Sequence, residues 1–520
     1  MSTRSLLAFP AYVATSLRPV YRDVAITVVT AVLVAAGGLT AVSLVGRMGP
    51  DALAEFLMLR RVAAWLVSAL LLGMGVGVAR FVAQCANRPD IRDAYFIAAL
   101  GCVAALTIPV VLAMNVAAPA FARVLLGNQR ESQLISPLSI VLIAYVCHGV
   151  VFAYYRGRLL MTHANALQFV TFAMIPVMTV ALLHGGQSIA RIYVAIGLLS
   201  LVTNGVLAAS ILVRLPRFPV CETRAIRPSL LRYGIARLPA DLGPGALLAL
   251  GPVIAAQFVP ISQVGYFLLG ISILNVFGTA ANPLNMVLLS KVSLMLAQGR
   301  KAEARECAGY LLSAAVSIGL FGSLQLLIYA DVFVKMWVGP RFLAGVPVIR
   351  ILGSAMPFFL VYSSLRSLVD AASAKSHNAL NATIALAMFC VFVGLEVKAV
   401  SSKWLIEAFA SSLLLALVLL AVLTTHSVRV LFQLRPNWAD IRRSGLGAGL
   451  LGALSLFVRW TEGFSTNPSA SLFTLAISSA LFMGYLFYIR SPWLMFLNKT
   501  LFSAKKPKCQ PSNAASQAAY

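Results

Sequence analysis

The chain has 520 residues, of which 60% are hydrophobic and only 11% charged, yet its formal net charge is +25. Soluble domains carry about a quarter charged residues, so this composition excludes an ordinary soluble protein and disfavours the nucleic-acid binder that so basic a chain would otherwise suggest. A basic excess in so apolar a chain is typical of a polytopic membrane protein, where Lys and Arg gather in the cytoplasmic loops.

Apolar runs long enough to cross a bilayer recur along the chain. A helix needs roughly 20 mostly apolar residues to cross about 30 Å of hydrocarbon. The thirteenth run is short and glycine-rich, so twelve spans remain an alternative to fourteen. The fourteen runs cover residues 24–46, 54–79, 94–116, 136–155, 164–184, 192–213, 234–258, 265–290, 307–329, 346–365, 378–395, 404–424, 444–458 and 471–489.

The cations predict the orientation of these spans. No cleavable signal peptide precedes the first run, so we expect the first helix to remain as an anchor. Alternating the connections between the two sides places 28 of the 41 Lys and Arg residues on one side and 9 on the other. Because short Lys- and Arg-rich loops stay cytoplasmic, both termini are predicted to be cytoplasmic. Four cations fall inside the predicted spans: Arg60, Arg61, Arg237 and Arg350.

The two halves of the chain resemble each other. Phe121–Gly127 follows the third run and Phe333–Gly339 follows the ninth, at an offset of 212 residues. Asn165 and Asn378 open the fifth and eleventh runs, at an offset of 213. Parallel repeats of this kind build transporters whose substrate site lies between the halves.

The sequence therefore predicts an all-α polytopic membrane protein with 12–14 transmembrane helices, in two six-helix lobes around a central cavity, plus two C-terminal helices. The basic linker between the lobes is expected to lie along the anionic inner leaflet, which makes anionic membrane lipids expected partners. The expected units are a cytoplasmic N-terminus (1–23), an N-lobe with spans one to six (24–213), a basic cytoplasmic linker (214–233), a C-lobe with spans seven to twelve (234–424), two extra helices (425–489) and a cytoplasmic tail (490–520).

Charged side chains inside a span are candidate functional residues, because each costs roughly 2.5–3.5 kcal/mol to insert and so faces water, a partner or substrate. Arg60 and Arg61 have no acidic residue four positions earlier. They predict the cationic wall of a water-filled cavity, with snorkelling to the outer head groups as the alternative. Arg237 has Asp241 at i+4, so a structural ion pair and a substrate contact both stay open.

Two further charges lie near the outer ends of predicted spans. Arg350, in the tenth run, is either an interfacial anchor or a substrate contact. Glu407, in the twelfth, is a candidate for ion coupling or for pairing with one of the cations, and the alternative is an interfacial carboxylate.

Signals of catalysis and metal binding are missing from the sequence. The seven cysteines form no C-x-x-C motif, none lies in a predicted outer loop, and the five histidines lack metal-ligand spacing. No P-loop, G-x-S-x-G or paired-carboxylate pattern occurs. We therefore expect a protein that is not an enzyme and that uses neither a cofactor nor a metal site.

Five short segments point to a known family: Tyr155–Arg158 with Asn165, Val264–Phe267, Asn282–Ser290, Gln298–Glu303 and Arg350–Gly353. Through these segments the chain resembles Wzx-type bacterial flippases of the multidrug/oligosaccharidyl-lipid/polysaccharide exporter superfamily. The resemblance covers roughly residues 15–425. The resemblance implies two lobes around a central cavity. It also implies that undecaprenyl-pyrophosphate-linked oligosaccharides are turned from the inner to the outer leaflet, for exopolysaccharide, capsule or O-antigen synthesis.

The resemblance and the charges agree on an anionic substrate, because arginine suits bidentate contact with phosphate. Arg60 and Arg61, with Arg237, Asp241 and Arg350, are the expected substrate-binding residues. The expected location is the bacterial inner membrane, and the expected partners are the lipid-linked oligosaccharide and the polysaccharide polymerase or chain-length proteins, with no nucleic acid. Three alternatives stay open: a cation-coupled multidrug exporter, a flippase for lipid-linked peptidoglycan precursor, and a membrane polysaccharide polymerase.

Overall fold

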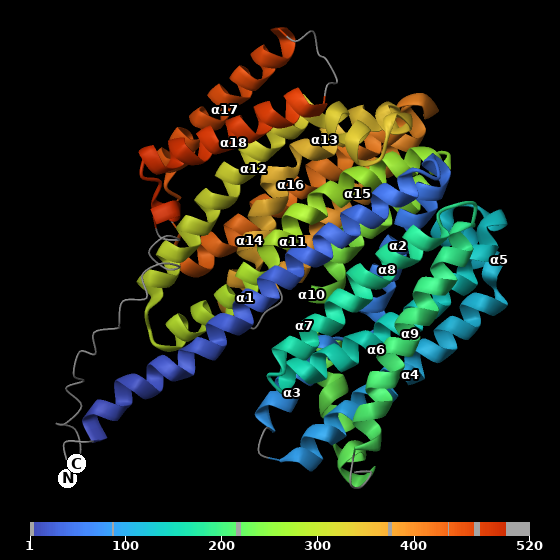
Figure 1. Ribbon diagram of the computed structural model, residues 1–520, viewed down its shortest axis with the longest axis vertical. Helices are drawn as coiled ribbons and strands as arrows, with labels where there is room; N and C mark the ends of the chain where they lie inside the picture. Colours follow the sequence, from blue (N-terminus) through green and yellow to red (C-terminus); the bar gives the residue numbers. More distant parts are fainter. Residues whose placement is uncertain are drawn as a thin grey trace.

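The computed structural model describes residues 5–85, 88–214, 220–372, 377–434, 436–461 and 468–495. It is all helical over these residues, which confirms the all-α polytopic fold (Figure 1). Eleven helices are long and apolar enough to cross a membrane, or thirteen if each of two bent helix pairs forms one span. A shorter apolar stretch, Gly245–Ala255, covers the outer part of the seventh predicted span.

The first half of the chain forms one group of helices. Two of them begin with proline followed by an acidic residue, Pro50–Asp51 and Pro89–Asp90. Proline lacks the N–H that the first turn leaves unpaired, and a carboxylate interacts favourably with the helix dipole. The elements are α1 (Ser5–Gly46), α2 (Pro50–Leu70), α3 (Met74–Gln84), α4 (Pro89–Val116), α5 (Ala118–Leu126), η1 (Gln129–Leu134), α6 (Ile135–Gly157), α7 (Met161–Phe169), η2 (Val170–Met174), α8 (Ile175–Leu183) and α9 (Ile189–Val213).

The second half repeats this succession and adds two helices. Its elements are α10 (Val220–Ala255), α11 (Ile261–Ala297), α12 (Lys301–Trp337), η3 (Pro340–Gly345), α13 (Val346–Ser354), α14 (Met356–Ala372), α15 (His377–Ala399), η4 (Ser402–Trp404), α16 (Leu405–Phe432), α17 (Trp438–Thr461) and α18 (Pro468–Tyr488). Each of the fourteen apolar runs of the sequence falls on one of these helices or on a bent pair. Residues 220–233 of the expected linker are helical and continuous with the seventh span.

The packing of the helices follows the same pattern in both halves. In the first, α6 packs against α4 and α9, and α1 packs against α7 and α8. In the second, α14 packs against α12 and α16, and α10 packs against α15. The two glycines of the repeated segments have the same role, since Gly127 (φ 80°) and Gly339 (φ 106°) each separate a helix from a following 3-10 helix. Glycine adopts such positive φ values without steric cost.

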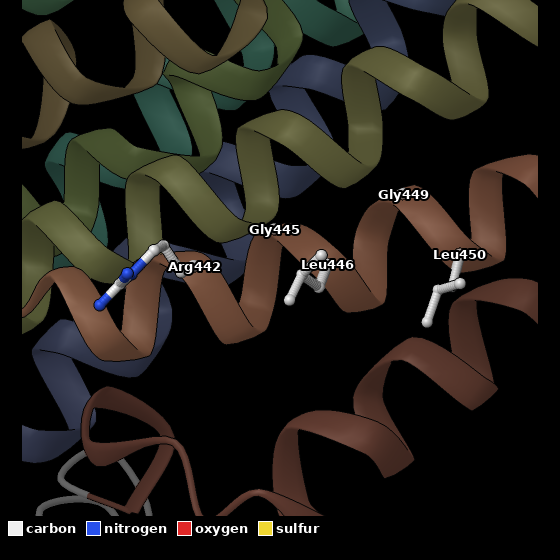
Figure 2. Close-up of a pocket in the computed structure, with 5 residues that line it drawn as sticks. All are labelled: Arg442, Gly445, Leu446, Gly449 and Leu450. Atoms are coloured by element: carbon white, nitrogen blue, oxygen red, sulfur yellow. The ribbon is translucent and has the colours of Figure 1, made fainter.

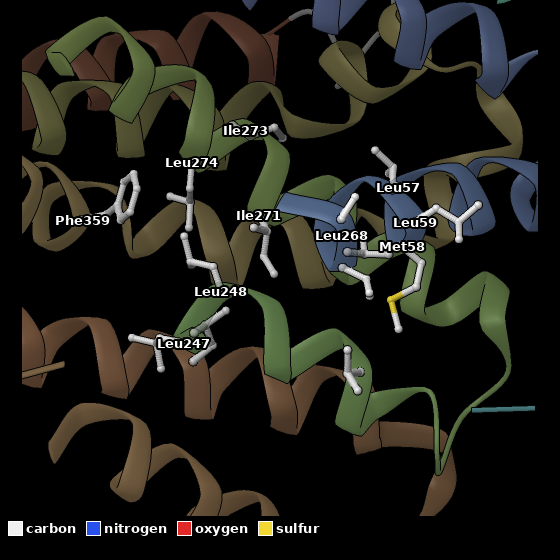
Figure 3. Close-up of a cluster of buried hydrophobic side chains, with 14 of the residues drawn as sticks. Leu57, Met58, Leu59, Leu247, Leu248, Leu268, Ile271, Ile273, Leu274 and Phe359 are labelled. Atoms are coloured by element: carbon white, nitrogen blue, oxygen red, sulfur yellow. The ribbon is translucent and has the colours of Figure 1, made fainter. Parts of the chain in front are cut away.

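A buried apolar cluster joins the two halves. The side chains labelled in Figure 3 come from α2, α10, α11 and α14, so this part of the cluster spans the contact between the lobes. Hydrogen bonds tie the ends of helices across the same contact. The indole Nε1 of Trp337 donates to the carbonyl oxygen of Leu39 at 2.9 Å, and Nε2 of Gln257 donates to that of Arg123 at 2.9 Å. These contacts hold α1 and α5 of the first half against α12 and α10 of the second.

The two C-terminal helices α17 and α18 lie beside α12, at the edge of the bundle (Figure 1). A small second core that includes Ala448, Phe482 and Leu486 packs them against Phe321 and Leu324 of α12. On α17, an open groove is lined by Arg442, Gly445, Leu446, Gly449 and Leu450 (Figure 2). The extra helices are therefore an addition to the outside of the second half.

Two spans are bent where the sequence suggested continuous helices. Between α2 and α3, Leu72 (φ 47°) and Gly73 (φ 68°) leave the helical conformation, and the helix axes differ by 47°. Between α13 and α14 the axes differ by 44°, at Ala355. By contrast α10 continues as one helix through its four prolines.

Candidate functional site

Arg60 and Arg61 lie in the third turn of α2, about 15 Å along the helix from Pro50. Arg60 is exposed and Arg61 half-buried. Over the described residues, neither guanidinium has a carboxylate within the 4.0 Å of an ion pair. The structure therefore brings together two adjacent cations whose charges no nearby acidic side chain neutralises.

Arg60 extends toward α1. A Cβ atom added to Gly38 of α1 would lie 3.0 Å from its Nη2 atom, so the glycine is what lets the guanidinium approach so closely. Tyr145 of α6 and Tyr193 of α9 are within electrostatic range of the same group. Tyr193 is itself fixed, because its hydroxyl donates to the carbonyl oxygen of Phe56 at 2.7 Å. These neighbours belong to α1, α6 and α9, three helices of the first half.

The other predicted charges lie on other helices, α10, α13 and α16. Arg237 is half-buried on α10, and the side chain of Asp241 lies outside the described residues. Glu407 is half-buried in the first turn of α16. Its Oε2 atom is buried, and it has no hydrogen-bond partner in the described part of the chain. In that same part, no ion pair joins Glu407 to Arg60.

Arg350 belongs to an ionic cluster that the sequence did not indicate. Its Nη2 atom lies 3.9 Å from Oδ1 of Asp331, and the other oxygen of this carboxylate accepts from Nη2 of Arg459. Arg459 is only 1% exposed, and its guanidinium also lies 5.2 Å from the centroid of the Tyr329 ring. The cluster joins α12, α13 and α17, and its ion pairs place two arginines on one carboxylate within the described part of the chain. The half-exposed Arg350 is its weakly held member.

A second group missed by the sequence reading is a buried polar cluster in the first half: His148 of α6, Asn204 of α9 and Thr171 of η2. Asn204 Nδ2 donates to the Ser200 carbonyl oxygen at 2.7 Å and approaches Thr171 Oγ1 at 3.4 Å. Its Oδ1 is therefore an acceptor, so the His148 Nδ1 at 3.2 Å must carry a hydrogen. All three side chains are at most 4% exposed.

The local geometry around this cluster is unusual. Thr171 lies in a π-helical turn, Val170–Met174, and such turns in an otherwise α-helical span occur frequently at functional sites. At an offset of 212 residues the second half has Leu360, Thr383 and Ala416 in the corresponding positions, and at 213 it has Val361, Ile384 and Leu417, so neither His148 nor Asn204 has a polar counterpart. The polar cluster is therefore a feature of the first half alone. A lone histidine and asparagine inside apolar runs were the only sequence signals.

Comparisons with known proteins support the fold. No family model and no curated protein matches the chain. Among solved structures, the chain is similar to a lipid II flippase, MurJ, in an inward closed conformation (TM-score 0.68, 12% identity, 89% of this chain and 98% of that one). It is also similar to an inward-facing multidrug resistance MATE family transporter of the MOP superfamily (TM-score 0.64, 14% identity, 78% and 94%).

A third structure, the eukaryotic MATE transporter AtDTX14, gives a TM-score of 0.58 at 13% identity and covers 83% of this chain and 99% of that one. Identities this low establish the fold alone. Each of the three matched structures is covered almost completely, so the likeness extends over both halves of the bundle. The chain is a multi-pass membrane protein with the fold of MOP-superfamily transporters and flippases.

Proposed function

We propose that this protein is a Wzx-type flippase of the bacterial inner membrane, which turns pyrophosphate-linked lipid saccharides from the inner to the outer leaflet by alternating access. The observation that carries the proposal is the adjacent pair Arg60 and Arg61 inside a membrane-spanning helix, with no carboxylate within 4.0 Å over the described residues. Two guanidinium groups provide paired donors to the oxygens of a phosphate group.

The position of Arg60 supports a role in binding. Its guanidinium lies against Gly38 of α1, in range of Tyr145 and Tyr193. A charge in the apolar region is retained where it contacts water or a ligand. Arg60 and Arg61 would hold the anionic head while the lobes move, and Arg237 with Asp241, and Arg350, would meet it on either side of that position. Glu407 is the proposed ion-coupling carboxylate, since its Oε2 atom is buried without a hydrogen-bond partner among the described residues.

The test replaces both arginines in a host that depends on this protein for surface polysaccharide. Arg60→Ala/Arg61→Ala should reduce surface polysaccharide at least about tenfold and accumulate the lipid-linked intermediate, because losing two charge-assisted contacts of about 1.5–3 kcal/mol each exceeds one decade in affinity. Arg60→Lys/Arg61→Lys should retain part of the activity. Arg442→Ala, on the exposed face of α17, is the matched control. Normal export by the alanine variant at normal membrane level would exclude this role.

A multidrug exporter is the main alternative, because the fold is shared with MATE transporters. A cavity for cationic drugs would require carboxylates near the centre. Glu396 and Glu407 are the half-buried candidates, at the ends of α15 and α16 that meet at the connecting η4. Resistance to cationic dyes that depends on Glu396 and Glu407, and is unaffected by the arginine substitutions, would favour the exporter.

A further inference from the structure

The first half of α10 carries a mixed polar and apolar groove. Its lining residues recur at three- and four-residue intervals, so they form one face of the helix. The groove has a volume of about 610 Å³ and is open to the surroundings. It combines a guanidinium, a phenol and a hydroxyl with small apolar side chains. The lining residues are Ala225, Pro228, Ser229, Arg232, Tyr233 and Ala236.

A second helix brings another cation to this groove. The bend after α2 lets α3 cross α10 closely, because a Cβ added to Gly73 would lie 2.9 Å from the carbonyl oxygen of Gly234. The crossing places the Arg80 guanidinium 5.3 Å from the centroid of the Tyr233 ring. Arg80 of α3 thus contacts the ring of Tyr233, Arg232 of α10 lines the groove together with that ring, and both arginines are exposed.

The aromatic ring between these cations is held in place. Phe81 of α3 contacts Tyr233 edge-on, with ring centroids 5.5 Å apart, and stacks on Tyr95 of α4 at 5.0 Å. Gly77 of α3 leaves room for the same ring, since its added Cβ would lie 3.2 Å from Tyr233 Cδ1. Arg80 therefore rests on a fixed platform, which lowers the entropy cost of binding a ligand there.

The charges of this groove are not neutralised from nearby. Elsewhere on the surface, cations pair with acidic neighbours: Arg92 Nε lies 3.0 Å from Asp93, and Arg300 Nη2 lies 2.5 Å from Glu303. Over the described residues, neither Arg80 nor Arg232 has a carboxylate within 4.0 Å. An exposed, uncompensated pair of guanidinium groups beside a phenol favours a phosphate-bearing ligand.

The position of the groove along α10, relative to the membrane, indicates the kind of molecule that carries this phosphate. A hydrocarbon layer of about 30 Å that ends at Ala255 reaches back about twenty residues along α10, to about Ile235. Arg232 and Tyr233 are then at the level of the lipid head groups, where tyrosine is enriched in membrane proteins. The positive-inside distribution of the loops assigns this end to the cytoplasmic leaflet, which contains the anionic lipids.

We propose that this groove binds an anionic phospholipid of the inner leaflet, with the phosphate between Arg80 and Arg232 and against the Tyr233 hydroxyl. The helix that carries the groove packs against α4 of the first lobe and α15 of the second. A lipid bound there therefore contacts a helix that packs against both lobes. The proposal is independent of what the transporter carries.

The experiment measures lipid retention by the purified protein. The protein is reconstituted in phosphatidylcholine nanodiscs with or without phosphatidylglycerol, released in mild detergent, and analysed by native mass spectrometry. Arg80→Gln/Arg232→Gln should retain about threefold less phosphatidylglycerol than the unmodified protein, and Arg232→Gln alone an intermediate amount. Arg442→Gln, which lines the groove on α17 without a second cation, should retain as much as the unmodified protein.

Two further measurements distinguish a lipid phosphate from a free phosphate ion as the ligand of the groove. Sodium phosphate added to the protein in phosphatidylcholine should not raise its unfolding temperature, whereas phosphatidylglycerol should. Stabilisation by free phosphate that is lost in Arg80→Gln/Arg232→Gln would assign the groove to a soluble anion and overturn the lipid proposal. Equal phosphatidylglycerol retention by the double variant and the Arg442→Gln control would overturn it as well. If the double variant does not fold, Arg232→Gln alone gives the same decision.

Discussion

At the scale of single residues, the membrane interior determines how polar side chains are used. Arg459 is almost fully buried, and the Asp331 carboxylate and the Tyr329 ring face its guanidinium group. Its partner lies 128 residues earlier in the chain, and no local spacing rule could indicate that pair. Arg60 and Arg61 were identifiable from sequence because the evidence was local: two charges in an apolar run without acidic neighbours.

Replacing Arg459 by methionine should strongly destabilise the second half. Among the ion pairs of the described residues, the substitution leaves the Asp331 carboxylate the 3.9 Å contact to Arg350, and breaking a buried ion pair costs about 3 kcal/mol. The measurement is the unfolding temperature in mild detergent. Arg459→Met/Asp331→Asn should recover much of the loss, while the exposed Arg442→Met should be neutral. Equal stability of Arg459→Met and the unmodified protein would show that this ion pair contributes little.

Asn204→Leu tests the polar cluster of the first half. The substitution removes the acceptor of the His148 Nδ1–H and the donor to Thr171, and an unsatisfied buried polar group costs about 1–3 kcal/mol. Thermal unfolding should therefore shift to lower temperature. His148→Phe/Asn204→Leu, which removes both polar partners, should be more stable than Asn204→Leu alone. A single variant as stable as the unmodified protein would contradict this account.

At the scale of elements, the break between α2 and α3 is the feature that the sequence reading missed. The segment from Gly73 to Gly77 has three alternating glycines within one predicted span. In the structure only Gly73 has positive φ, and Gly75 and Gly77 are helical. What distinguishes Gly73 is its contact with Gly234 of α10, a residue distant in sequence. The spacing of the glycines in the sequence therefore does not predict that contact.

Gly73→Ala should disrupt this crossing, and Gly75→Ala should not. At Gly73 the new Cβ meets the Gly234 backbone at 2.9 Å and the backbone has φ of 68°, so strain of about 1–3 kcal/mol is expected. At Gly75 the added Cβ meets no atom within 4 Å, and alanine in a helix is favoured over glycine by up to about 1 kcal/mol. Unfolding temperatures of the two variants provide the measurement. A similar loss in both would indicate that the crossing is not the cause.

At the scale of the whole molecule, the repeat was the most informative sequence signal. The segments ending at Gly127 and Gly339 were recognisable because each places a glycine with positive φ after a helix, a conformation that favours the same residue in both copies. The contact between the lobes was not predictable in the same way. It depends on apolar side chains from four helices, such as Met58 of α2 and Leu268 of α11, and their pairing is fixed only in three dimensions.

The orientation of the bundle is the first prediction at this scale. In a variant whose seven cysteines are replaced by serine, Ser401→Cys and Gln298→Cys provide exposed single sites in the η4 and α11–α12 connections. A membrane-impermeant maleimide should label Ser401→Cys in intact cells and Gln298→Cys only after the membrane is opened, because Lys- and Arg-rich connections stay cytoplasmic. The reverse pattern would invert the topology.

The second prediction at this scale concerns movement between the lobes. A Cβ added to Gly46 of α1 would lie 3.1 Å from Cβ of Val338, just after α12, whereas disulfides have Cβ atoms about 3.5–4.5 Å apart. A shift of a few tenths of an ångström therefore lets Gly46→Cys/Val338→Cys form a disulfide between the lobes. If transport requires these ends to separate, the oxidised variant should lose export and the reduced variant should regain it.

Each single cysteine variant is the control for this crosslink, since it has the new side chain without the bond. Loss of export in a single variant would attribute the effect to packing at Gly46 rather than to the disulfide. Full export by the oxidised pair would mean that α1 and α12 stay together through the cycle. Alternating access would then have to open the molecule elsewhere, and the contact of Gln257 with Arg123, between α5 and the end of α10, would be the next position to crosslink.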